Sequence, residues 1–306
     1  MSNSFLMHLG GRVVDLRERT YVMGVLNVTP DSFSDGGKYM SIEAAVARAV
    51  EMEREGADFI DVGGESSRPG ADPIGVDEEI RRVVPVLEVL RHSIHVPLSI
   101  DTYKAPVAEA ALDAGASFVN DISALTADES MGKLVAERRV PVVLMHIRGN
   151  PKTMQDNPTY RDVVAEVKAW LRNRVAIAKG HGIEQVVIDP GIGFGKRVED
   201  NLSLLNHLDE FLELGLPILV GPSRKSFIGA ILDLPVENRL EGTAAAVAIS
   251  IARGANIIRV HDVKEMVRVA RVVDSIIRER VIKPASQFAA DVSDNPHQER
   301  SPAPNG

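Results

Sequence analysis

Two stretches of sequence, YVMGVLN (residues 21–27) and VPLSID (residues 96–101), each run through apolar residues and end on a polar one. Six further stretches have the same form, and continuous apolar runs are typical of buried strands in a parallel sheet. In (β/α)8 barrels the loops after such strands carry the chemistry, so the polar endings are expected at one mouth. The other six stretches are FIDVGGE (59–65), SFVND (117–121), VPVVLMH (140–146), QVVIDPG (185–191), LPILVGPSRK (216–225) and NIIRVH (256–261).

Segments with helical periodicity alternate with these strands. In residues 41–56, Ala45, Ala49 and Met52 recur on one helical face, and Gly56 follows as a stop signal. This alternation predicts a parallel sheet. Eight units without a break in strand order favour a closed (β/α)8 TIM barrel over a doubly wound open sheet. The other predicted helices span residues 77–90, 105–114, 129–138, 160–181, 201–214, 239–253 and 262–280.

Two terminal pieces lie outside the repeating pattern. Residues 5–16 carry a Gly10-Gly11 pair between short apolar runs, which predicts an N-terminal β-hairpin covering the bottom of the barrel. Residues 283–306 are rich in Pro, Ser, Asn, Asp and Gln and are predicted to form a disordered tail. We therefore expect one barrel domain over residues 1–282.

Composition narrows the classes of partner. The net charge of -8 and pI near 5.6 argue against a general nucleic-acid surface, so an anionic substrate must be held by locally clustered cations. The absence of cysteine excludes disulfides, thiolate metal sites and a cysteine nucleophile. Because the sequence shows neither a signal pattern nor an apolar stretch near about 18 residues, we expect a cytoplasmic protein without a membrane partner.

The first polar loop, NVTPDSFSDGG (residues 27–37), combines Pro30 and paired glycines with several oxygen-bearing side chains. It is interpreted as a mobile lid. Asn27 and Asp35 offer hard oxygen ligands suited to Mg2+, which keeps several waters and commonly binds substrate phosphates with few protein ligands. The alternative is ordinary turn chemistry, in which the same residue types dominate.

A second glycine-bounded loop, GGESSRPG (residues 63–70), contains Arg68. Its guanidinium could receive an aromatic carboxylate or a phosphate. The alternative is a solvated surface arginine without a ligand.

Asp101, Asn120 and Asp189 each end an apolar strand, so their side chains are expected to face one concave mouth. A carboxylate accepts two parallel hydrogen bonds from an aminopyrimidine edge, and an amide both donates and accepts. The cluster therefore suits a pterin or a guanine-like ring, and the alternative is a buried polar network that stabilises the strand ends.

Cations follow the last two strands, where barrels often hold phosphate. Arg259 is suited to grip a phosphate in a bidentate manner, whereas Lys225 supplies a point charge that could reach a ring carbonyl or nitrogen. His261 could donate to phosphate or cap the last helix, with Asp262 and Glu265 as an N-terminal capping pair.

Two further features are given structural interpretations. DPGIGFGK (residues 189–196) lacks the third glycine of GxGxxG and has no helix opening at once, which argues against a nicotinamide site. His146 is interpreted as structural, and Met145 as packing against a ring.

Eight motifs occur in order between residues 21 and 280: MGVLNVTPDSFSDGG, GGESSRPG, SIDTYK, VNDIS, LMH, DPGIGFGK, GPSRKSFIG and RVHDV. On these motifs the chain resembles the dihydropteroate synthase family. The resemblance implies condensation of 6-hydroxymethyl-7,8-dihydropterin diphosphate with p-aminobenzoate, giving 7,8-dihydropteroate and pyrophosphate in folate biosynthesis. It also implies Mg2+, inhibition by sulfonamides, and a homodimer through helices near the end of the barrel.

The resemblance also implies a role for each matching residue. The catalytic group is expected to be Asp101, Lys225, Arg259 and His261. The pterin is expected to lie among Asp101, Asn120, Met145, Asp189 and Lys225. The diphosphate is expected at Asn27, Arg68, Arg259 and His261, with the metal on Asn27 and Asp35. The p-aminobenzoate is expected to contact Phe33, Ser67, Arg68, Pro69 and Ser226.

Two departures from the family pattern are mild. Ser67 stands where the family often has threonine, and Ile192 where it commonly has phenylalanine. Loss of the threonine methyl could alter contacts to p-aminobenzoate, and Ile192 could alter packing beside the pterin pocket. Neither change removes a charged group.

The mechanism expected from the resemblance needs no protein nucleophile. The metal and cations would stabilise the departing diphosphate, Asp101 would stabilise positive charge on the exocyclic carbon, and the neutral arylamine would attack.

Two other functions remain open. Methyltetrahydrofolate-binding methyltransferase barrels also use strand-end Asp and Asn, but they need neither the first loop nor Arg259 and His261. A non-catalytic pterin-binding paralogue would be expected to lose loop or anion-binding residues, and all of them remain in this chain.

Overall fold

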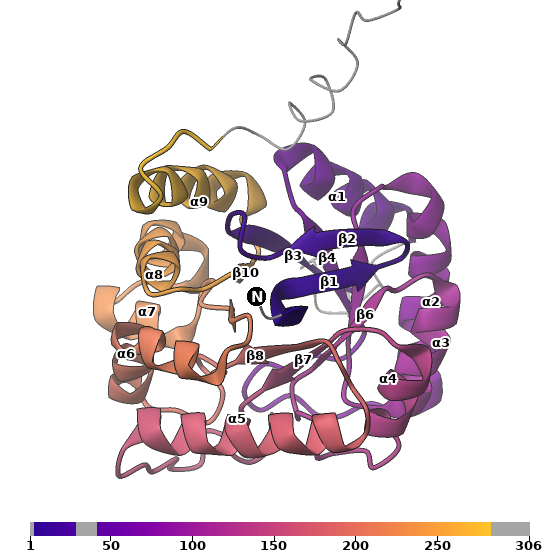
Figure 1. Ribbon diagram of the computed structural model, residues 1–306, viewed down its shortest axis with the longest axis horizontal. Helices are drawn as coiled ribbons and strands as arrows, with labels where there is room; N and C mark the ends of the chain where they lie inside the picture. Colours follow the sequence, from indigo (N-terminus) through magenta and orange to yellow (C-terminus); the bar gives the residue numbers. More distant parts are fainter. Residues whose placement is uncertain (1–2, 29–41, 283–306) are drawn as a thin grey trace, which may run out of the picture.

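The computed structural model describes residues 3–28 and 42–282. The tail expected at residues 283–306 and most of the first loop lie outside this part of the chain. In the part described, eight parallel strands form one sheet in the order β8-β7-β6-β5-β4-β3-β10-β9 (Figure 1). A parallel bridge between Ile188 and Ile218 joins the two edges of the sheet and brings the barrel close to closure. The predicted barrel is confirmed, and the alternative of an open, doubly wound sheet is wrong.

Strand register aligns the polar strand ends at one edge of the sheet. Asn27 pairs with Gly63, and Gly63 in turn pairs with Asp101, so three successive strands end side by side. The strands are β3 Tyr21–Asn27, β4 Phe59–Gly63, β5 Leu98–Asp101, β6 Phe118–Asp121, β7 Val142–Met145, β8 Val186–Asp189, β9 Leu219–Val220 and β10 Ile257–Val260.

Helices surround the sheet (Figure 1). The segment predicted as one helix over residues 201–214 is instead α6 followed by a 3-10 helix, Leu208–Leu214. The short helix α7 had no prediction, because seven residues give too little periodicity to recognise. The α-helices are α1 Ile42–Glu55, α2 Val76–Ser93, α3 Ala105–Ala114, α4 Met131–Arg138, α5 Val163–Gly180, α6 Val198–Asn206, α7 Ser226–Leu232, α8 Leu240–Ala252 and α9 Val263–Ile277.

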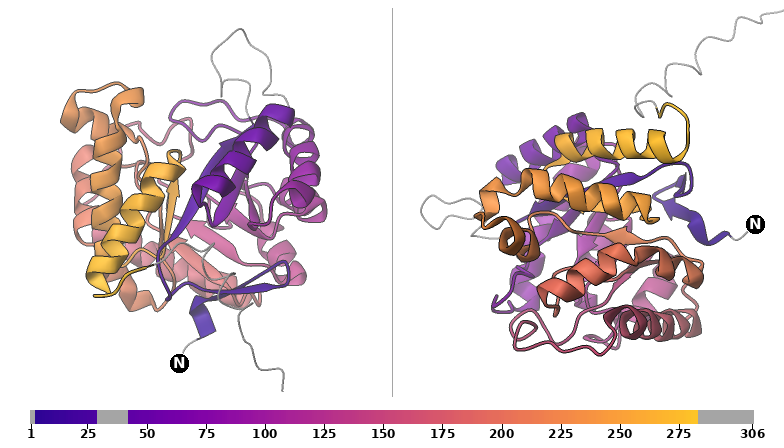
Figure 2. Two further views of the ribbon diagram at one scale, coloured as in Figure 1. Left: turned by 90° about the horizontal axis from the view of Figure 1, so that it is seen from above. Right: turned by 90° about the vertical axis from the view of Figure 1, so that its left-hand side faces the viewer.

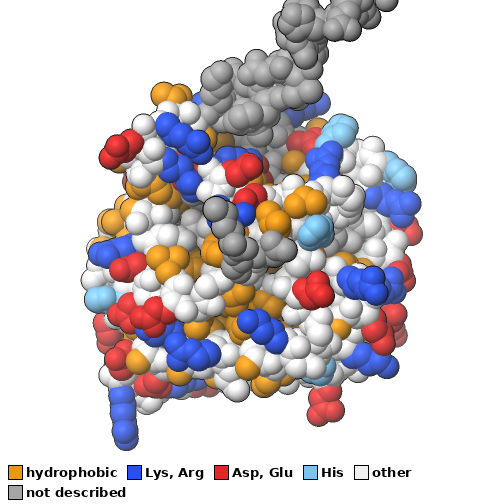
Figure 3. All heavy atoms as spheres, viewed as in Figure 1, with side chains coloured by type: hydrophobic (Ala, Val, Ile, Leu, Met, Phe, Trp, Pro, Cys, Tyr) orange, Lys and Arg blue, Asp and Glu red, His pale blue; other side chains and the backbone are white. Residues whose placement is uncertain are grey.

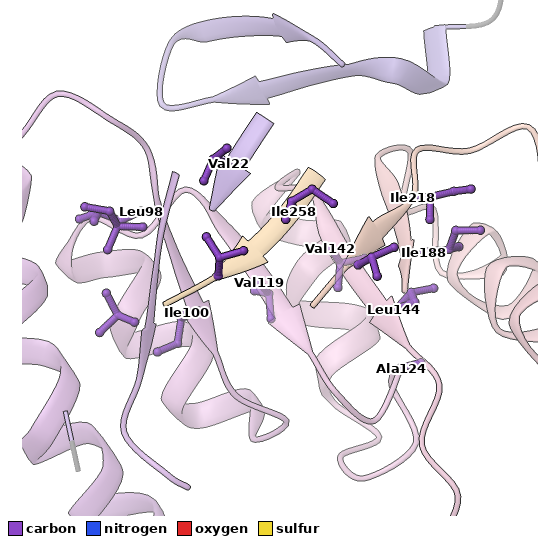
Figure 4. Close-up of a cluster of buried hydrophobic side chains, with 14 of the residues drawn as sticks. Val22, Leu98, Ile100, Val119, Ala124, Val142, Leu144, Ile188, Ile218 and Ile258 are labelled. Atoms are coloured by element: carbon purple, nitrogen blue, oxygen red, sulfur yellow. The ribbon is translucent and has the colours of Figure 1, made fainter. Parts of the chain in front are cut away.

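The main core lies between the strands and the helices (Figure 4). Successive side chains of a strand point to opposite faces. Val22, Ile100 and Ile258 therefore face the helices, whereas Met23 and Ile257 face the inside of the barrel. The inward positions nearest the strand ends are the ones left for polar residues.

The N-terminal hairpin consists of β1 (Leu6–Leu9) paired antiparallel with β2 (Arg12–Asp15), as predicted. Figure 2 shows it lying across one end of the barrel. Its Met7 and Leu9 are buried against the first residues of strands, such as Phe59 and Phe118. These two phenylalanine rings meet edge to face, with centroids 5.7 Å apart. The hairpin thus covers the end of the barrel at which the strands begin.

Acidic and basic side chains are interspersed on the face of the molecule seen in Figure 3. In the described part of the chain, no helix is both long enough and apolar enough to cross a bilayer.

Candidate active site

A partly buried arginine connects two carboxylates in the mouth of the barrel. Arg259 of β10 donates from Nε to Asp61 Oδ2 at 2.6 Å and from Nη2 to Asp101 Oδ2 at 2.6 Å. Strand alternation explains the meeting, because all three residues occupy inward positions near the ends of β10, β4 and β5. The structure therefore places the predicted Asp101 and Arg259 in direct contact.

Asp61 is the central residue that the sequence interpretation missed. It is fully buried and also accepts hydrogen bonds from Asn120 Nδ2 at 2.9 Å and Ser99 Oγ at 2.5 Å. The available signal was a single carboxylate inside the apolar run of residues 59–63, where a charge is costly unless paired. Asn120 therefore reaches the network through Asp61.

Burial and neighbouring charges shift the ionisation of this network. Burial raises the pKa of Asp101, which the Arg259 charge opposes and the nearby Asp61 charge reinforces. For Arg259, burial disfavours the cation, but Asp61 and Asp101 outweigh it and hold the pKa above the usual range. One permanent cation thus stands between two carboxylates.

Asp189 ends β8, which the Ile188–Ile218 bridge brings next to the segment that leads into β9. Its Oδ1 accepts the Gly191 N–H at 2.7 Å, and burial raises its pKa to about 6. Gly191 has φ +70°, and a Cβ there would stand 1.9 Å from the carbonyl oxygen of His146. Only glycine therefore allows the turn that leads from Asp189 into the following loop.

Lys225 follows β9 and packs on the loop after β8. Its Nζ lies 3.8 Å from the centroid of the Phe194 ring, and a Cβ on Gly193 would stand 2.8 Å from its Cδ. Burial lowers the pKa of Lys225 to about 7, and the positive charge of Arg259 contributes to the shift. Near neutral pH, the protonation of Lys225 therefore depends on the charges that a ligand brings into the mouth of the barrel.

His261 follows β10 and is held by Ser223. Its backbone N–H donates to Ser223 Oγ at 3.2 Å, and its Nδ1 lies 3.1 Å from the same hydroxyl. If Ser223 donates to Nδ1, the hydrogen-bond network assigns the ring proton to Nε2. Burial lowers the pKa of His261 to about 3, so at neutral pH the ring is an uncharged donor.

The predicted capping pair at the last helix was wrong. Asp262 precedes α9, but its side chain makes no capping bond to that helix. Its two oxygens instead accept from Arg224, at 2.8 Å from Nε and 2.5 Å from Nη2. A bidentate guanidinium is the stronger partner for a carboxylate, which explains the preference.

Met145 and His146 have different neighbours. Met145 is buried with Ile122, Met154 and Phe194 in a small apolar cluster at the mouth. The His146 ring meets Trp170 edge to face, its Nδ1 lies 3.0 Å from Lys196 Nζ, and burial lowers its pKa to about 2. An uncharged, enclosed ring agrees with the structural interpretation of His146.

The other predicted contacts are on the surface or outside the described residues. Arg68 and Pro69 are exposed in the second loop, Ser67 is half-buried, and Ser226 is exposed at the start of α7. Phe33 and Asp35 fall in the part of the chain that is not described. The departure at position 192 lies in the main core, where Ile192 is buried against the barrel.

Asn27 is the part of the predicted metal site that the structure describes. The Cβ position of Gly63 lies 3.6 Å from Asn27 Oδ1 and 3.7 Å from Asp101 Oδ2, so both oxygens flank the end of β4. Residues 3–28 and 42–282 contain no group of three or more His, Cys, Asp or Glu that could hold a metal ion. A site with one or two protein ligands, completed by water and phosphate, fits Mg2+.

Strand-end carboxylates, an amide and partly buried cations meet in the mouth of this barrel, and the chain matches the class of pterin-binding enzymes. The family model for pterin-binding enzymes matches residues 23–261. A dihydropteroate synthase from Synechocystis is 47% identical over 273 residues, covering 88% of this chain and 94% of that protein. The chain belongs to the dihydropteroate synthase family.

Solved structures of the family agree in fold. The Xanthomonas albilineans dihydropteroate synthase with 4-aminobenzoic acid has a TM-score of 0.84 and 46% identity, covering 90% of this chain and 98% of that one. The Yersinia pestis dihydropteroate synthase in complex with a sulfonamide drug has a TM-score of 0.85 and 42% identity, covering 89% and 99%. The family expected from the sequence motifs is therefore confirmed.

Proposed function

We propose that the protein condenses 6-hydroxymethyl-7,8-dihydropterin diphosphate with p-aminobenzoate to give 7,8-dihydropteroate and pyrophosphate. The observation that carries this proposal is the network of Asp61, Asp101 and Arg259 in the mouth of the barrel. The network sets carboxylates and a permanent cation beside each other. Such an arrangement suits a reaction in which positive charge develops on a carbon atom and negative charge on a leaving group.

The pterin ring is proposed to enter the mouth deeply. Asp189 and Asn120 would exchange hydrogen bonds with its polar edges, and Lys225 would donate to a ring carbonyl or nitrogen. Met145 would provide an apolar wall together with the cluster in which it is buried. The positions of these side chains at inward strand ends support the assignment.

The diphosphate is proposed to lie nearer the rim, against Arg259, His261, Asn27 and Arg68. The neutral His261 would donate from Nε2, and Arg259 would retain full charge because two carboxylates stabilise its cation. Mg2+, held by Asn27 and Asp35, would neutralise charge on the phosphate oxygens when bound.

The chemical step breaks the bond between the exocyclic carbon and the diphosphate oxygen. The electron pair leaves with pyrophosphate, and the dihydropterin ring shares the positive charge left on carbon. Asp101 would stabilise that charge electrostatically. The neutral amine of p-aminobenzoate then forms the new carbon–nitrogen bond and loses a proton.

The p-aminobenzoate is proposed to bind among Phe33, Ser67, Arg68, Pro69 and Ser226. Arg68 carries a guanidinium suited to the carboxylate of the substrate. Arg68 and Pro69 are exposed, so both side chains are accessible to a ligand from solvent. Sulfonamides would compete for the same place.

A homodimer is proposed through the last helices of the barrel. Ile249 of α8 and Val272 and Ile276 of α9 are 50%, 60% and 68% exposed, although they are large apolar residues. Exposed apolar patches commonly mark protein interfaces.

The proposed compartment is the cytoplasm. Sedimentation of the purified protein tests the homodimer, and cell fractionation tests the compartment.

The function is tested by incubating the purified protein with dihydropterin diphosphate, p-aminobenzoate and Mg2+, with and without EDTA. Formation of both pyrophosphate and dihydropteroate is expected, with loss of both in EDTA. Binding of the pterin without either product would refute the synthase activity and favour a non-catalytic paralogue.

A further inference from the structure

The second loop continues past Gly70 to residue 73, and its residues 66–73 are held at their base by a single carboxylate. Glu65 stands just before the loop, and its Oε2 accepts the N–H of Ile74, just after the loop, at 2.8 Å. Its Oε1 accepts the hydroxyl of Tyr103 at 2.5 Å. One side chain thus joins the two ends of the segment that carries Ser67, Arg68 and Pro69.

Lys104 fixes that carboxylate to the barrel. Its Nζ donates to Glu65 Oε2 at 2.6 Å, to Glu79 Oε2 at 2.6 Å and to the carbonyl oxygen of Ile74 at 2.9 Å. These three bonds use all three protons of the ammonium. The side chains of Glu79, Glu65 and Lys104 are 1%, 9% and 14% exposed. We call these three residues the Lys104 clamp.

The backbone just before Glu65 is also tightly placed. Gly64 packs on α2 so closely that a Cβ would stand 2.7 Å from Val83 Cγ1, and its carbonyl oxygen accepts from Arg82 at 3.0 Å. Glu79 belongs to the same helix. The base of the second loop is therefore anchored to α2 on one side and to Lys104, at the start of α3, on the other.

The tip of the loop has weaker support. Gly70 donates to the carbonyl oxygen of Pro151 at 3.0 Å, and Asp72 pairs with Lys152 at 2.7 Å. The side chains of this pair are 78% and 62% exposed, and such surface pairs contribute little stability. Part of the loop borders a cavity of about 280 Å³, so it has no continuous packed floor. The clamp is therefore the less exposed of the two sets of ion pairs that hold the loop.

We propose that Lys104 is a positioning residue for the second substrate: the clamp sets the second loop so that Ser67, Arg68 and Pro69 form the p-aminobenzoate site. This inference rests on the proposed function. All three bonds of the Lys104 ammonium go to Glu65, Glu79 and Ile74, so the residue acts through the loop and not on the reacting atoms. Pterin binding, which involves the interior strand ends, should not depend on it.

The test compares Lys104→Met and Glu65→Gln with the wild-type enzyme. Because breaking a buried ion pair is strongly unfavourable, KM for p-aminobenzoate should rise at least about tenfold in Lys104→Met. The Kd for 6-hydroxymethyl-7,8-dihydropterin, which lacks the diphosphate proposed to contact Arg68, should stay within about twofold when measured by calorimetry, as expected for distant independent sites. Glu65→Gln should shift KM in the same direction. Because Glu65→Gln leaves the Lys104–Glu79 pair in place, it tests the role of the clamp even if Lys104→Met does not fold.

Lys152→Met is the matched control, since it removes a lysine whose ion pair is also with the second loop but is exposed. Its KM for p-aminobenzoate should change by less than about twofold. The proposal is overturned if the folded clamp variants retain the wild-type KM, or if they lose pterin and p-aminobenzoate affinity equally. Absence of product with the wild-type enzyme would instead defeat the synthase activity, which keeps the two failures distinct.

Discussion

The interior of the barrel mouth and the second loop make opposite kinds of site. In the interior, Asp61 and Asp101 both pair with Arg259, and all three residues come from strands and are largely removed from water. In the loop, Arg68 and Pro69 are exposed, and order comes from a clamp at the base. The difference indicates that the pterin half of the proposed site is formed in advance, whereas the p-aminobenzoate half depends on loop placement.

The largest effect is expected from Arg259→Met. This change leaves Asp61 and Asp101 close together without their shared cation, which should cost about 3 kcal/mol of unfolding free energy or more. Because the diphosphate also loses a cation, kcat/KM should fall by about 10³-fold. Urea denaturation and steady-state kinetics measure the two. Wild-type stability in the variant would mean that the interior is not held together by this arginine.

A smaller, more selective effect is expected from Asp101→Asn. The amide keeps the shape of the side chain but not the negative charge that would stabilise the developing cation. Turnover should therefore fall by about 10²-fold, with a smaller change in Kd for the pterin. Calorimetry and single-turnover kinetics separate the two. Unchanged turnover would defeat the proposed role of Asp101.

The pH profile tests the interior half alone. Asp189 must be ionised to accept pterin hydrogen bonds, which requires a pH above its pKa of about 6. Lys225 must be protonated to donate as a cation, which requires a pH below its pKa of about 7. Asp101 must also be ionised to stabilise the developing positive charge, and burial raises its pKa to about 7. For the free enzyme, kcat/KM for the pterin substrate should therefore pass through a narrow maximum near pH 7 and decline on both sides. A profile that is flat from about pH 5 to about pH 9 would show that ionisation of these groups does not control kcat/KM.

The smallest effect is expected at the loop. Ser67→Thr adds one methyl group to a half-buried position, and burial of a methyl group is worth about 0.8 kcal/mol. KM for p-aminobenzoate should change by no more than about fourfold, with the pterin Kd unchanged. Competition by a sulfonamide, measured in the same assay, should shift in parallel. A large change in pterin affinity would show that the two halves are not separate.

Sequence patterns were sufficient to predict the barrel, but they predicted only some of the polar residues in its interior. The polar strand ends identified Asp101, Asn120 and Asp189, which precede loops and stand out against apolar runs. Asp61 was missed because it lies two residues before the end of β4, where its partners on three other strands leave no local signal. The capping prediction for Asp262 failed for the same reason, since Arg224 is distant in sequence.

The Lys104 clamp illustrates the same limit from the other region. Glu65, Glu79 and Lys104 are spread over 40 residues and three elements, and each alone has the appearance of an ordinary surface charge. Helix propensity gave no reason to expect Glu79 to be 1% exposed. Only the packing of α2 against α3 and β4 removes these charges from water and forces them to pair.

The sequence by itself determined the barrel, its hairpin and the family, because apolar runs, helical periodicity and short motifs act within a few residues of chain. Tertiary structure alone decided which charges pair. Arg259 and Asp61 are separated by 198 residues, yet the register of parallel strands brings their atoms within 2.6 Å. Electrostatic energy depends on distance and burial, and neither quantity exists until the strands are aligned and water has been excluded.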